Sequence, residues 1–384
     1  MIMHSEPLRV CNVITGLGQG GAESFLERLV LATEGKGLSH LVVSLTDEGV
    51  HGPRLAAAGV PVVALHGRSP FGVIRLVQKL VKLFKVERPG VVNTWMYHAN
   101  LVGGVAARLA GPLPVVWNIR ANRVTRELAK DATVALARLS GVAARWLCRC
   151  VVTNSERGLA THVSWGYPRD LFTMIPNGFD LERLKPDCVL RGEARAALGI
   201  APDQLAIGML ARRDPFKGHG TFIQAIASAR MPPRTMFIMA GPGVSDGDPE
   251  MSSLCRDAGV AGVRLLGPQE NVQRYFAALD VFTLPSLDEG FPNVVAEAMA
   301  CGVPCAVTDS GDSAWVVGDL GRVVPPGNVE ALATATIELL DAVANDTVDF
   351  AALRQRIVRE LSVERLVDQT ESALRPLVRE WSAA

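Results

Sequence analysis

Short apolar runs and amphipathic stretches alternate along the first half of the chain. The apolar runs, rich in β-branched residues, predict strands at 8–15, 40–46, 60–66, 90–95, 114–119 and 150–155. Between them lie stretches with apolar residues at helical spacing, such as AESFLERLVLATEGKG. Strands that are apolar throughout and separated by helices are typical of parallel βαβ units. The first half is therefore expected to form one Rossmann-like domain.

The same alternation restarts in the second half. It predicts further strands at 205–210, 235–241, 262–267, 280–286, 304–309 and 321–327. The predicted fold class is therefore α/β, with two Rossmann-like domains over 1–180 and 181–364 and a boundary near 176–187. The last stretch, VERLVDQTESALRPLVREW, predicts an amphipathic helix at about 365–384 that packs back on the first domain.

Length and composition agree with this division. A chain of 384 residues that is 48% hydrophobic and 20% charged is too long for a single compact core. No apolar run approaches the ~20 residues that a membrane-spanning helix needs. The beginning, MIMHSEPLRVCNVI, lacks the layout of a signal peptide. The seven cysteines lack zinc-ligand spacing, so we expect reduced thiols in a cytoplasmic protein.

The formal net charge is zero, but the charges are unevenly distributed. Residues 1–180 hold 20 Lys and Arg against 12 Asp and Glu, and the remainder holds 19 against 27. The basic residues come without interleaved aromatic residues, which argues against a nucleic-acid partner. An anionic membrane surface or a phosphorylated substrate fits the basic half better.

The stretch DEGFPNVVAEAMACGVP, residues 288–304, carries two carboxylates beside a predicted helix start. Helix-end rules predict a helix that begins near Pro292 and ends near Gly302. Glu289 should then lie at the mouth of the helix N-terminus, and Glu297 one or two turns in. Unpaired N–H groups at a helix N-terminus suit an anion. Two carboxylates beside an anion site suggest that sugar hydroxyls bind there as well.

The stretch LARRDPFKGH, residues 210–219, leaves the first strand of the second half through a charged loop. Arg212 and Lys217, aimed into one crevice, would hold a diphosphate and neutralise its charge as it leaves. The alternative is a solvated loop, because charged loops are common.

The stretch GLGQGGAE, residues 16–23, follows the first predicted strand and opens a helix. Gly16, Gly18 and Gly21 satisfy G-x-G-x-x-G, the dinucleotide fingerprint, and Asp47 is a candidate for its acidic residue. An NAD-dependent oxidoreductase is therefore one alternative, and a purely structural turn is another. A phosphate or acceptor site is the interpretation that we favour.

The triplet DGD, residues 246–248, matches the D-x-D by which many glycosyltransferases hold a divalent ion. It lies in a polar segment rich in Gly and Pro, so a solvated loop is favoured. We predict no metal and no other cofactor.

These stretches together resemble the GT-B glycosyltransferases of family four, also called the glycosyl transferases group 1 family. The most specific match is E-x7-E, Glu289 to Glu297, and the second is G-R-x4-K-G, in which Ala211 replaces the usual first Gly. The third is GGAE, residues 20–23, and the fourth is IPNGFD, residues 175–180. The resemblance extends over nearly the whole chain.

The resemblance implies two domains that face each other across a cleft, with a nucleotide diphosphate-sugar, expected to be a UDP-sugar, held by the second. Glu297 would then bind the ribose, and Glu289 would face the donor sugar. Arg212 and Lys217 would take the diphosphate in place of a metal, and transfer would retain the anomeric configuration. The other positions expected to contact the donor are Gly20, Gly21, Gly290, Phe291, Pro292, Asn293 and Val294.

One departure concerns a histidine that relatives often carry at the end of the fourth strand. That place reads Asn93-Thr94-Trp95 here, and His98 is the nearest substitute. We include His98 among the candidate catalytic residues, beside Glu289, Arg212 and Lys217. The alternative is a helix-start residue with ordinary hydrogen bonds.

The first domain is expected to hold the acceptor, with Asn118, Arg120 and Asn177 on that side. The acceptor is expected to be a saccharide or a lipid-linked sugar, such as one linked to a polyprenyl diphosphate. Two basic clusters could contact an anionic membrane, which would make the enzyme peripheral at the inner face: Lys79, Lys82 and Lys85, and then Arg123, Arg126 and Lys130. Alternatively, the stripe Val77, Leu80, Val81 and Phe84 faces the core and the lysines face water. A catalytically silent sugar-nucleotide scaffold is a third functional alternative.

Overall fold

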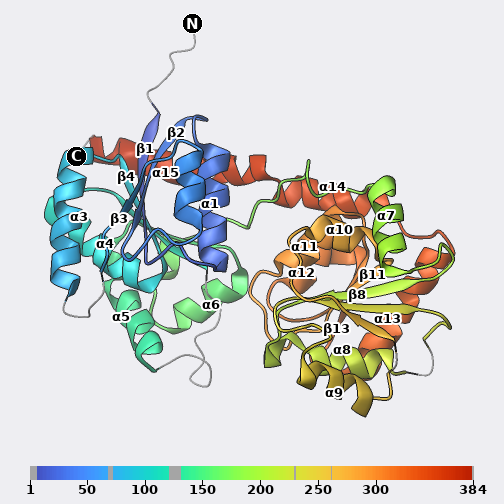
Figure 1. Ribbon diagram of the computed structural model, residues 1–384. Coiled ribbons are helices and arrows are strands. Elements are labelled where there is room, and N and C mark those ends of the chain that lie inside the picture. Colours follow the sequence, from blue (N-terminus) through green and yellow to red (C-terminus); the bar gives the residue numbers. More distant parts are fainter. Residues whose placement is uncertain (1–6, 68–71, 121–130, 229–230, 261, 383–384) are drawn as a thin grey trace, which may run out of the picture. The chain divides into compact units, whose positions relative to one another are not determined.

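The chain folds into two compact α/β units in the computed structural model, which describes residues 7–67, 72–120, 131–228, 231–260 and 262–382 (Figure 1). Unit 1 comprises Met1–Gly178 and Val363–Ala384, and unit 2 comprises Phe179–Ser362. The last helix, α15 (Val363–Ser382), therefore belongs to unit 1, although it follows unit 2 in the sequence.

Unit 1 is built on a parallel sheet of seven strands in the order β3-β2-β1-β4-β5-β6-β7. Their bounds are β1 Leu8–Ile14, β2 Leu38–Ser44, β3 Val62–Ala64, β4 Val91–Trp95, β5 Val115–Ile119, β6 Cys150–Thr153 and β7 Phe172–Met174. Six of these lie where the apolar runs predict strands. The seventh, β7, is missing from the prediction because three half-buried residues show no alternation that a pattern could detect.

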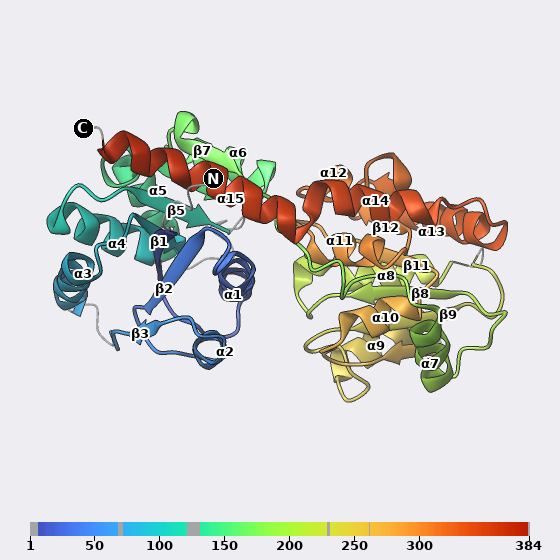
Figure 2. The ribbon, with the colours of Figure 1, turned by 90° about the horizontal axis from the view of Figure 1, so that it is seen from above.

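Helices cover both faces of this sheet, as the alternation of side chains along each strand requires. Val10 and Ile14 of β1 pack beneath α1 and α15, and Cys11 and Val13 pack beneath the helices of the other face. Figure 2 shows α3 and α4 on one side of β1 and β2 and α1 on the other. The helix bounds are α1 Gly21–Thr33, α2 His51–Ala57, α3 Val73–Glu87, α4 Met96–Ala110, α5 Asp131–Leu147 and α6 Glu156–Ser164.

Unit 2 is built on a parallel sheet of six strands in the order β10-β9-β8-β11-β12-β13. The strands are β8 Ala206–Leu210, β9 Met236–Ala240, β10 Val263–Leu265, β11 Val281–Leu284, β12 Cys305–Thr308 and β13 Arg322–Val324. The helices are α7 Cys188–Leu198, α8 His219–Ile226, α9 Pro249–Asp257, α10 Val272–Ala277, α11 Asn293–Ala300, α12 Ser313–Val317, α13 Val329–Ala344 and α14 Phe350–Leu361. All six strands overlap their predicted ranges, and the predicted α/β class with two Rossmann-like sheets is confirmed.

Each sheet reverses its strand order once. In unit 1 the reversal lies between β1 and β4, and in unit 2 it lies between β8 and β11. At such a point the loops that leave the two strands turn to opposite faces of the sheet and open a crevice at the carboxyl edge. The strand order therefore selects one place in each unit where a ligand can reach several loops.

A chain of polar side chains crosses the interior of the unit 1 sheet. Asn118 Nδ2 on β5 donates to Asn93 Oδ1 (2.5 Å), and Asn93 Nδ2 on β4 donates to Asn12 Oδ1 on β1 (2.9 Å). Asn12 Nδ2 lies 3.1 Å from His40 Nδ1 on β2, and His40 Nε2 lies 2.7 Å from Thr33 Oγ1. Because an amide nitrogen only donates, His40 Nδ1 must accept, and the ring is neutral. The side chain of Asn118, predicted to lie on the acceptor side, is therefore hydrogen bonded inside the sheet and not at its carboxyl edge.

Helix α3 turns the apolar side of its surface toward the core. Leu80 and Phe84 are buried, and Val77 and Val81 pack against the same cluster, whereas Lys79, Lys82 and Lys85 are exposed. Lys79 Nζ donates to the Leu65 carbonyl (2.8 Å). The apolar stripe of α3 thus covers the sheet, which is the alternative left open by the sequence. The second basic cluster, Arg123, Arg126 and Lys130, lies outside the described residues.

Two buried histidines make unit 1 sensitive to acid. Burial lowers the pKa of His40 and of His162 to about 4. The unfolded chain binds these protons near pH 6.5, so it holds more protons than the folded chain between pH 6.5 and 4. The stability that each neutral ring contributes, roughly 3 kcal/mol from this difference in pKa, is present above pH 6.5 and is lost as the pH falls toward 4.

We expect His162→Gln to flatten the fall of the free energy of unfolding between pH 7 and pH 4.5, whatever its effect at pH 7. Urea unfolding followed by tryptophan fluorescence measures this, because five of the six tryptophans belong to unit 1. His98→Gln, at an exposed position, is the matched control and should keep the wild-type pH dependence. Parallel pH profiles for wild type and His162→Gln would contradict the prediction.

Candidate active site

The candidate site lies at the carboxyl edge of unit 2, where the loops after β8 and β11 meet. The Leu287 N–H donates to the Phe216 carbonyl (2.7 Å), which joins the two loops. Gly218 has φ 73°, and a Cβ at this position would overlap the Pro285 carbonyl oxygen. Only glycine meets both conditions, which explains the glycine of the K-G pair.

Lys217 and Glu289 form an ion pair across this junction, although 72 positions separate them in the sequence. Lys217 Nζ lies 2.6 Å from Glu289 Oε1, and Ser286 Oγ donates to the same oxygen at 2.7 Å. The side chains are 24% and 8% exposed. Among the residues that the structure describes, none bonds to Glu289 Oε2. The carboxylate is therefore held by one oxygen while the other remains available to a ligand.

Helix α11 begins at Asn293 and ends at Ala300, close to the predicted bounds. Glu289 precedes it, and Glu297 follows one turn after its start. The approach to the helix is held by a second loop, since the Asp312 N–H donates to the Gly290 carbonyl (2.9 Å). Gly311, with φ 60°, allows this approach, because a Cβ there would overlap the same carbonyl oxygen.

The remaining donor-side positions in unit 2 differ in exposure. Phe291 is buried, and its ring packs 6.4 Å from Phe179 and 6.3 Å from Trp315 between ring centroids. Pro292 is buried too, whereas Val294 is half-buried and Asn293 is exposed. The Phe291 side chain therefore anchors the loop in the core, and only its backbone can face a ligand.

Arg212 leaves the carboxyl end of β8 and is exposed. Its Nη2 lies 3.0 Å from Asp214 Oδ2, and the other Asp214 oxygen accepts from the Phe216 N–H (3.0 Å). Asp214 thus shapes the loop and orients Arg212. The solvated-loop alternative does not account for a loop that is hydrogen bonded to its neighbour through Phe216 and paired with Glu289 through Lys217.

The carboxyl edge of unit 1 carries the other candidates. Gly20 is the N-cap of α1 and Gly21 its first residue. His98 is exposed in the first turn of α4. Arg120 follows β5, and its Nη1 donates to Asn177 Oδ1 (2.7 Å). Five of the predicted residues therefore lie on loops or helix starts at one edge of the sheet, with Arg120 and Asn177 in contact.

Two family models match the chain. The model described as "Glycosyltransferase Family 4" matches residues 19–183, and the model described as "Glycosyl transferases group 1" matches residues 201–342. The chain belongs to the group 1 glycosyltransferases of family four. The enzyme is thus a glycosyltransferase, and neither the oxidoreductase nor the silent scaffold agrees with this membership.

Two relatives of this glycosyltransferase match most of its length. EpsF of Bacillus subtilis (strain 168), named as a glycosyltransferase, is 29% identical over 80% of this chain and 81% of its own. The UDP-Gal:alpha-D-GlcNAc-diphosphoundecaprenol alpha-1,3-galactosyltransferase of Escherichia coli is 26% identical over 76% of each chain. The crystal structure of Anabaena HepE in complex with UDP has a TM-score of 0.84 at 22% identity, over 96% of this chain and all of that one. This likeness confirms the GT-B fold.

The D-x-D triplet of this glycosyltransferase has a structural task. Asp248 caps α9 by accepting from the Glu250 and Met251 N–H groups (3.0 and 3.1 Å), and it lies 3.6 Å from Arg213 Nε. Over the described ranges, no three His, Cys, Asp or Glu side chains come together as a metal site would require. Likewise, none of the helices in those ranges has the length and apolar character to span a bilayer.

The first glycine of G-x-G-x-x-G has a packing reason, whereas a Cβ at Gly18 or Gly21 would meet nothing within 4 Å. A Cβ at Gly16 would come 2.8 Å from Thr46 Oγ1, so the loop after β1 lies against the loop after β2. Asp47 accepts from the Gly49 N–H (3.1 Å) and shapes its own turn. Close packing thus accounts for Gly16, and Asp47 has a local role in its own turn.

His219 is a residue of the site region that the sequence interpretation missed. It is buried directly after Gly218, and its pKa is lowered by burial while contacts with the Ala211 and Asp214 backbone oppose that shift. These contacts hold the backbone at Ala211 and Asp214, in the loop that carries Arg212 and Lys217. Its position beside the K-G pair was the signal that could have found it.

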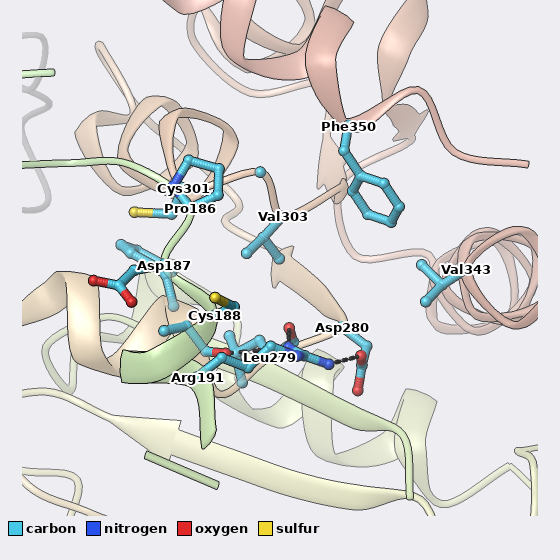
Figure 3. Close-up of a pocket in the computed structure, with 13 residues that line it drawn as sticks. Pro186, Asp187, Cys188, Arg191, Leu279, Asp280, Cys301, Val303, Val343 and Phe350 are labelled. Carbon is cyan, nitrogen blue, oxygen red and sulfur yellow. Dashed lines mark hydrogen bonds and ion pairs between the residues drawn. The ribbon is translucent and has the colours of Figure 1, made fainter. Parts of the chain in front are cut away.

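A pocket of about 310 Å³ lies elsewhere in unit 2, beside the amino ends of β11 and β12 (Figure 3). Its lining is largely apolar, and its Arg191–Asp280 ion pair (2.6 Å) is satisfied internally. Asp280 also accepts from the Ala206 N–H (2.7 Å), so this polar group ties strands together. The pocket contains none of the candidate residues, which lie at the opposite edge of the sheet.

The glycine requirement at 218 gives a direct test of the site's construction. Gly218→Ala should lower the free energy of unfolding of unit 2 by roughly 1–2 kcal/mol from the left-handed backbone alone, and by more if the Pro285 contact cannot relax. Gly220→Ala is the matched control, because a Cβ there meets nothing within 4 Å and the residue is helical. It should be neutral or stabilise by up to about 1 kcal/mol. Calorimetry measures the stability of both variants. Equal changes in the free energy of unfolding for Gly218→Ala and Gly220→Ala would contradict the prediction.

Proposed function

We propose that this enzyme transfers a sugar from a UDP-sugar, with retention and without a metal ion, to a saccharide or lipid-linked acceptor in the synthesis of a cell-surface polysaccharide or glycolipid. The observation that carries the proposal is the Lys217–Glu289 ion pair at the reversal point of the unit 2 sheet, beside the start of α11. A cation, a carboxylate and a helix N-terminus in one place suit a ligand that carries both phosphate and hydroxyl groups.

Each part of the donor has a partner at this edge. Arg212 and Lys217 supply cations for the diphosphate, and backbone groups of residues 290–294 supply the helix N-terminus. Glu289 Oε2 accepts from hydroxyls of the donor sugar, while Oε1 keeps its bonds to Lys217 and Ser286. Glu297, one turn further along α11, accepts from the ribose hydroxyls.

The chemistry needs charge stabilisation more than a side-chain base. As the bond between the anomeric carbon and the phosphate oxygen breaks, the leaving diphosphate gains negative charge, which Lys217 and Arg212 stabilise. The acceptor hydroxyl attacks from the same face, and the leaving phosphate oxygen takes its proton. The new glycosidic bond then has the configuration of the old one.

The identity of the donor and acceptor rests on relatives. The Escherichia coli relative is named for UDP-Gal and for a diphosphoundecaprenol-linked GlcNAc, and the HepE structures include complexes with UDP and UDP-glucose. We assign unit 1 to the acceptor, with Arg120 and Asn177 on that side, while Gly20 and Gly21 stay predicted donor contacts. His98 takes the place of the family histidine near the donor sugar.

We also propose that unit 1 docks on the inner face of an anionic membrane. The exposed side of α5 carries Leu139, Val142 and Trp146 at helical spacing, and the last two are each 74% exposed. Arg138, Arg145 and Arg149 flank this apolar stripe. An exposed helix face that combines Trp with arginine suits a lipid headgroup region.

Replacing the two glutamates should separate binding from turnover. Glu297→Ala should weaken UDP binding by roughly 1.5–3 kcal/mol, the range for a hydrogen bond to a charged group. Glu289→Gln should keep UDP affinity within a few-fold and lower kcat with a saturating donor. Calorimetry with UDP and turnover in EDTA measure both effects, with Glu338→Gln on an exposed helix of unit 2 as a control. Unchanged UDP affinity in Glu297→Ala would contradict the role of Glu297 in binding the ribose. Inactivation of the wild type by EDTA would contradict transfer without a metal ion.

The membrane proposal predicts salt-sensitive binding to vesicles. Each cation near an anionic surface contributes about 1 kcal/mol, and salt screens this attraction. Wild type should co-sediment with anionic vesicles at low salt. Trp146→Gln with Val142→Gln should release it even there, whereas Trp315→Gln in unit 2 should not. Equal vesicle binding of the double variant and the wild type would contradict the proposal that α5 contacts the membrane.

A further inference from the structure

Arg120 is a cation at the carboxyl edge of the unit 1 sheet. Its guanidinium carbon lies 3.7 Å above the Phe25 ring centroid and 5.8 Å from that of Trp95. Within the described part of the chain, its hydrogen-bond partner is the neutral Asn177 and not a carboxylate, and its Nε is buried without a partner. Burial lowers the pKa of Arg120 to about 9, which leaves it charged near pH 7. A half-buried cation without a counter-charge is costly unless an anion joins it.

Asn154 adds a second unsatisfied group next to this cation. It follows β6, is 6% exposed, and its Nδ2 lies 3.4 Å from Asn177 Oδ1, the oxygen that Arg120 Nη1 also reaches at 2.7 Å. Its own Oδ1 is buried with no donor. Arg120 Nη1 and Asn154 Nδ2 therefore meet at Asn177 Oδ1, while Arg120 Nε and Asn154 Oδ1 have no partner among the described residues. An anionic group that is bonded to a hydroxyl-bearing group would satisfy both.

We propose that Arg120 and Asn154 bind the acceptor through a phosphate group attached to its sugar, with Arg120 on the phosphate and Asn154 on a hydroxyl of that sugar. The inference rests on the proposed function, in which unit 1 holds the acceptor. It deepens that function by assigning the residues that recognise the phosphate of a glycosyl phosphate or diphosphate acceptor. The planar guanidinium donates two parallel hydrogen bonds to phosphate oxygens, which a lysine cannot match.

A purely structural role for Arg120 is the alternative. Asn177 directly precedes Gly178, whose carbonyl accepts from Arg28 Nη1 (2.9 Å), so both arginines hold the end of the first segment of unit 1. That role would not make Arg120 bind an anion. An experiment that measures anion binding and stability separately distinguishes the two roles.

The test uses the whole chain saturated with UDP, so that the donor site is filled, and titrates inorganic pyrophosphate by calorimetry. Wild type should bind one pyrophosphate. Arg120→Gln, which keeps a donor toward Asn177, should bind it at least ten-fold more weakly, and Arg120→Lys should fall between. Arg169→Gln, at an exposed arginine of the same unit, is the matched control. Equal affinity in Arg120→Gln and wild type, or an equal loss in Arg169→Gln, overturns the proposal.

A second measurement separates the acceptor from the donor as the source of the anion. A short prenyl diphosphate-linked GlcNAc and the octyl glycoside of the same sugar serve as acceptor probes, and binding is measured with UDP present. Arg120→Gln should bind the diphosphate-linked probe more weakly than wild type does. Its affinity for the octyl glycoside and for UDP should be unchanged. A loss of UDP affinity, or equal losses for both probes, overturns the proposal. Failure of wild type to bind UDP would instead contradict the proposed function.

Discussion

The approach of two loops at the reversal point of the unit 2 sheet governs the candidate donor site. Gly218 lies against the Pro285 carbonyl in a left-handed backbone conformation, and this approach brings Lys217 within 2.6 Å of Glu289. A side chain at 218 would push the first loop away and separate the charges. A second glycine, Gly311, holds the other side of the same segment against the Gly290 carbonyl. The chemistry of this edge thus depends on backbone contacts that side chains would prevent.

The two units stabilise their sheets by different polar means. In unit 1, asparagines on β1, β4 and β5 pass hydrogen bonds from strand to strand inside the sheet. In unit 2, Asp280 accepts from Arg191, Arg195 and the Ala206 N–H beside the amino end of β11. Both networks are internally satisfied. The carboxyl edges differ from them, because there Glu289 Oε2, Arg120 Nε and Asn154 Oδ1 have no partner among the described residues.

This contrast connects the fold to the proposed reaction. A glycosyltransferase must bind two polar substrates, so some of its polar atoms have to stay unsatisfied until a ligand arrives. Unit 2 offers a cation and a carboxylate at a helix start, and unit 1 offers a cation and an amide oxygen beside aromatic rings. The first set suits a nucleotide diphosphate-sugar, and the second suits a phosphorylated sugar. Each set lies on loops that a rigid parallel sheet positions.

The sequence by itself determined the α/β class, the twelve strands with apolar runs, and the E-x7-E and K-G motifs. Those features are local: apolar periodicity, helix-end residues and motif spacing all act within a few residues of one another. The three-residue strand β7 was too short to show a period.

The tertiary structure alone decided which polar residues face a ligand. Asn118 and Arg120 are two positions apart in the sequence, yet Asn118 is bonded to Asn93 inside the sheet while Arg120 lies over Phe25 at its edge. The pairing of Lys217 with Glu289 and the meeting of Arg120 and Asn154 at Asn177 likewise join residues that are far apart along the chain. No local pattern carries this information, because strand order sets which loops become neighbours, and strand order arises only when the whole sheet assembles.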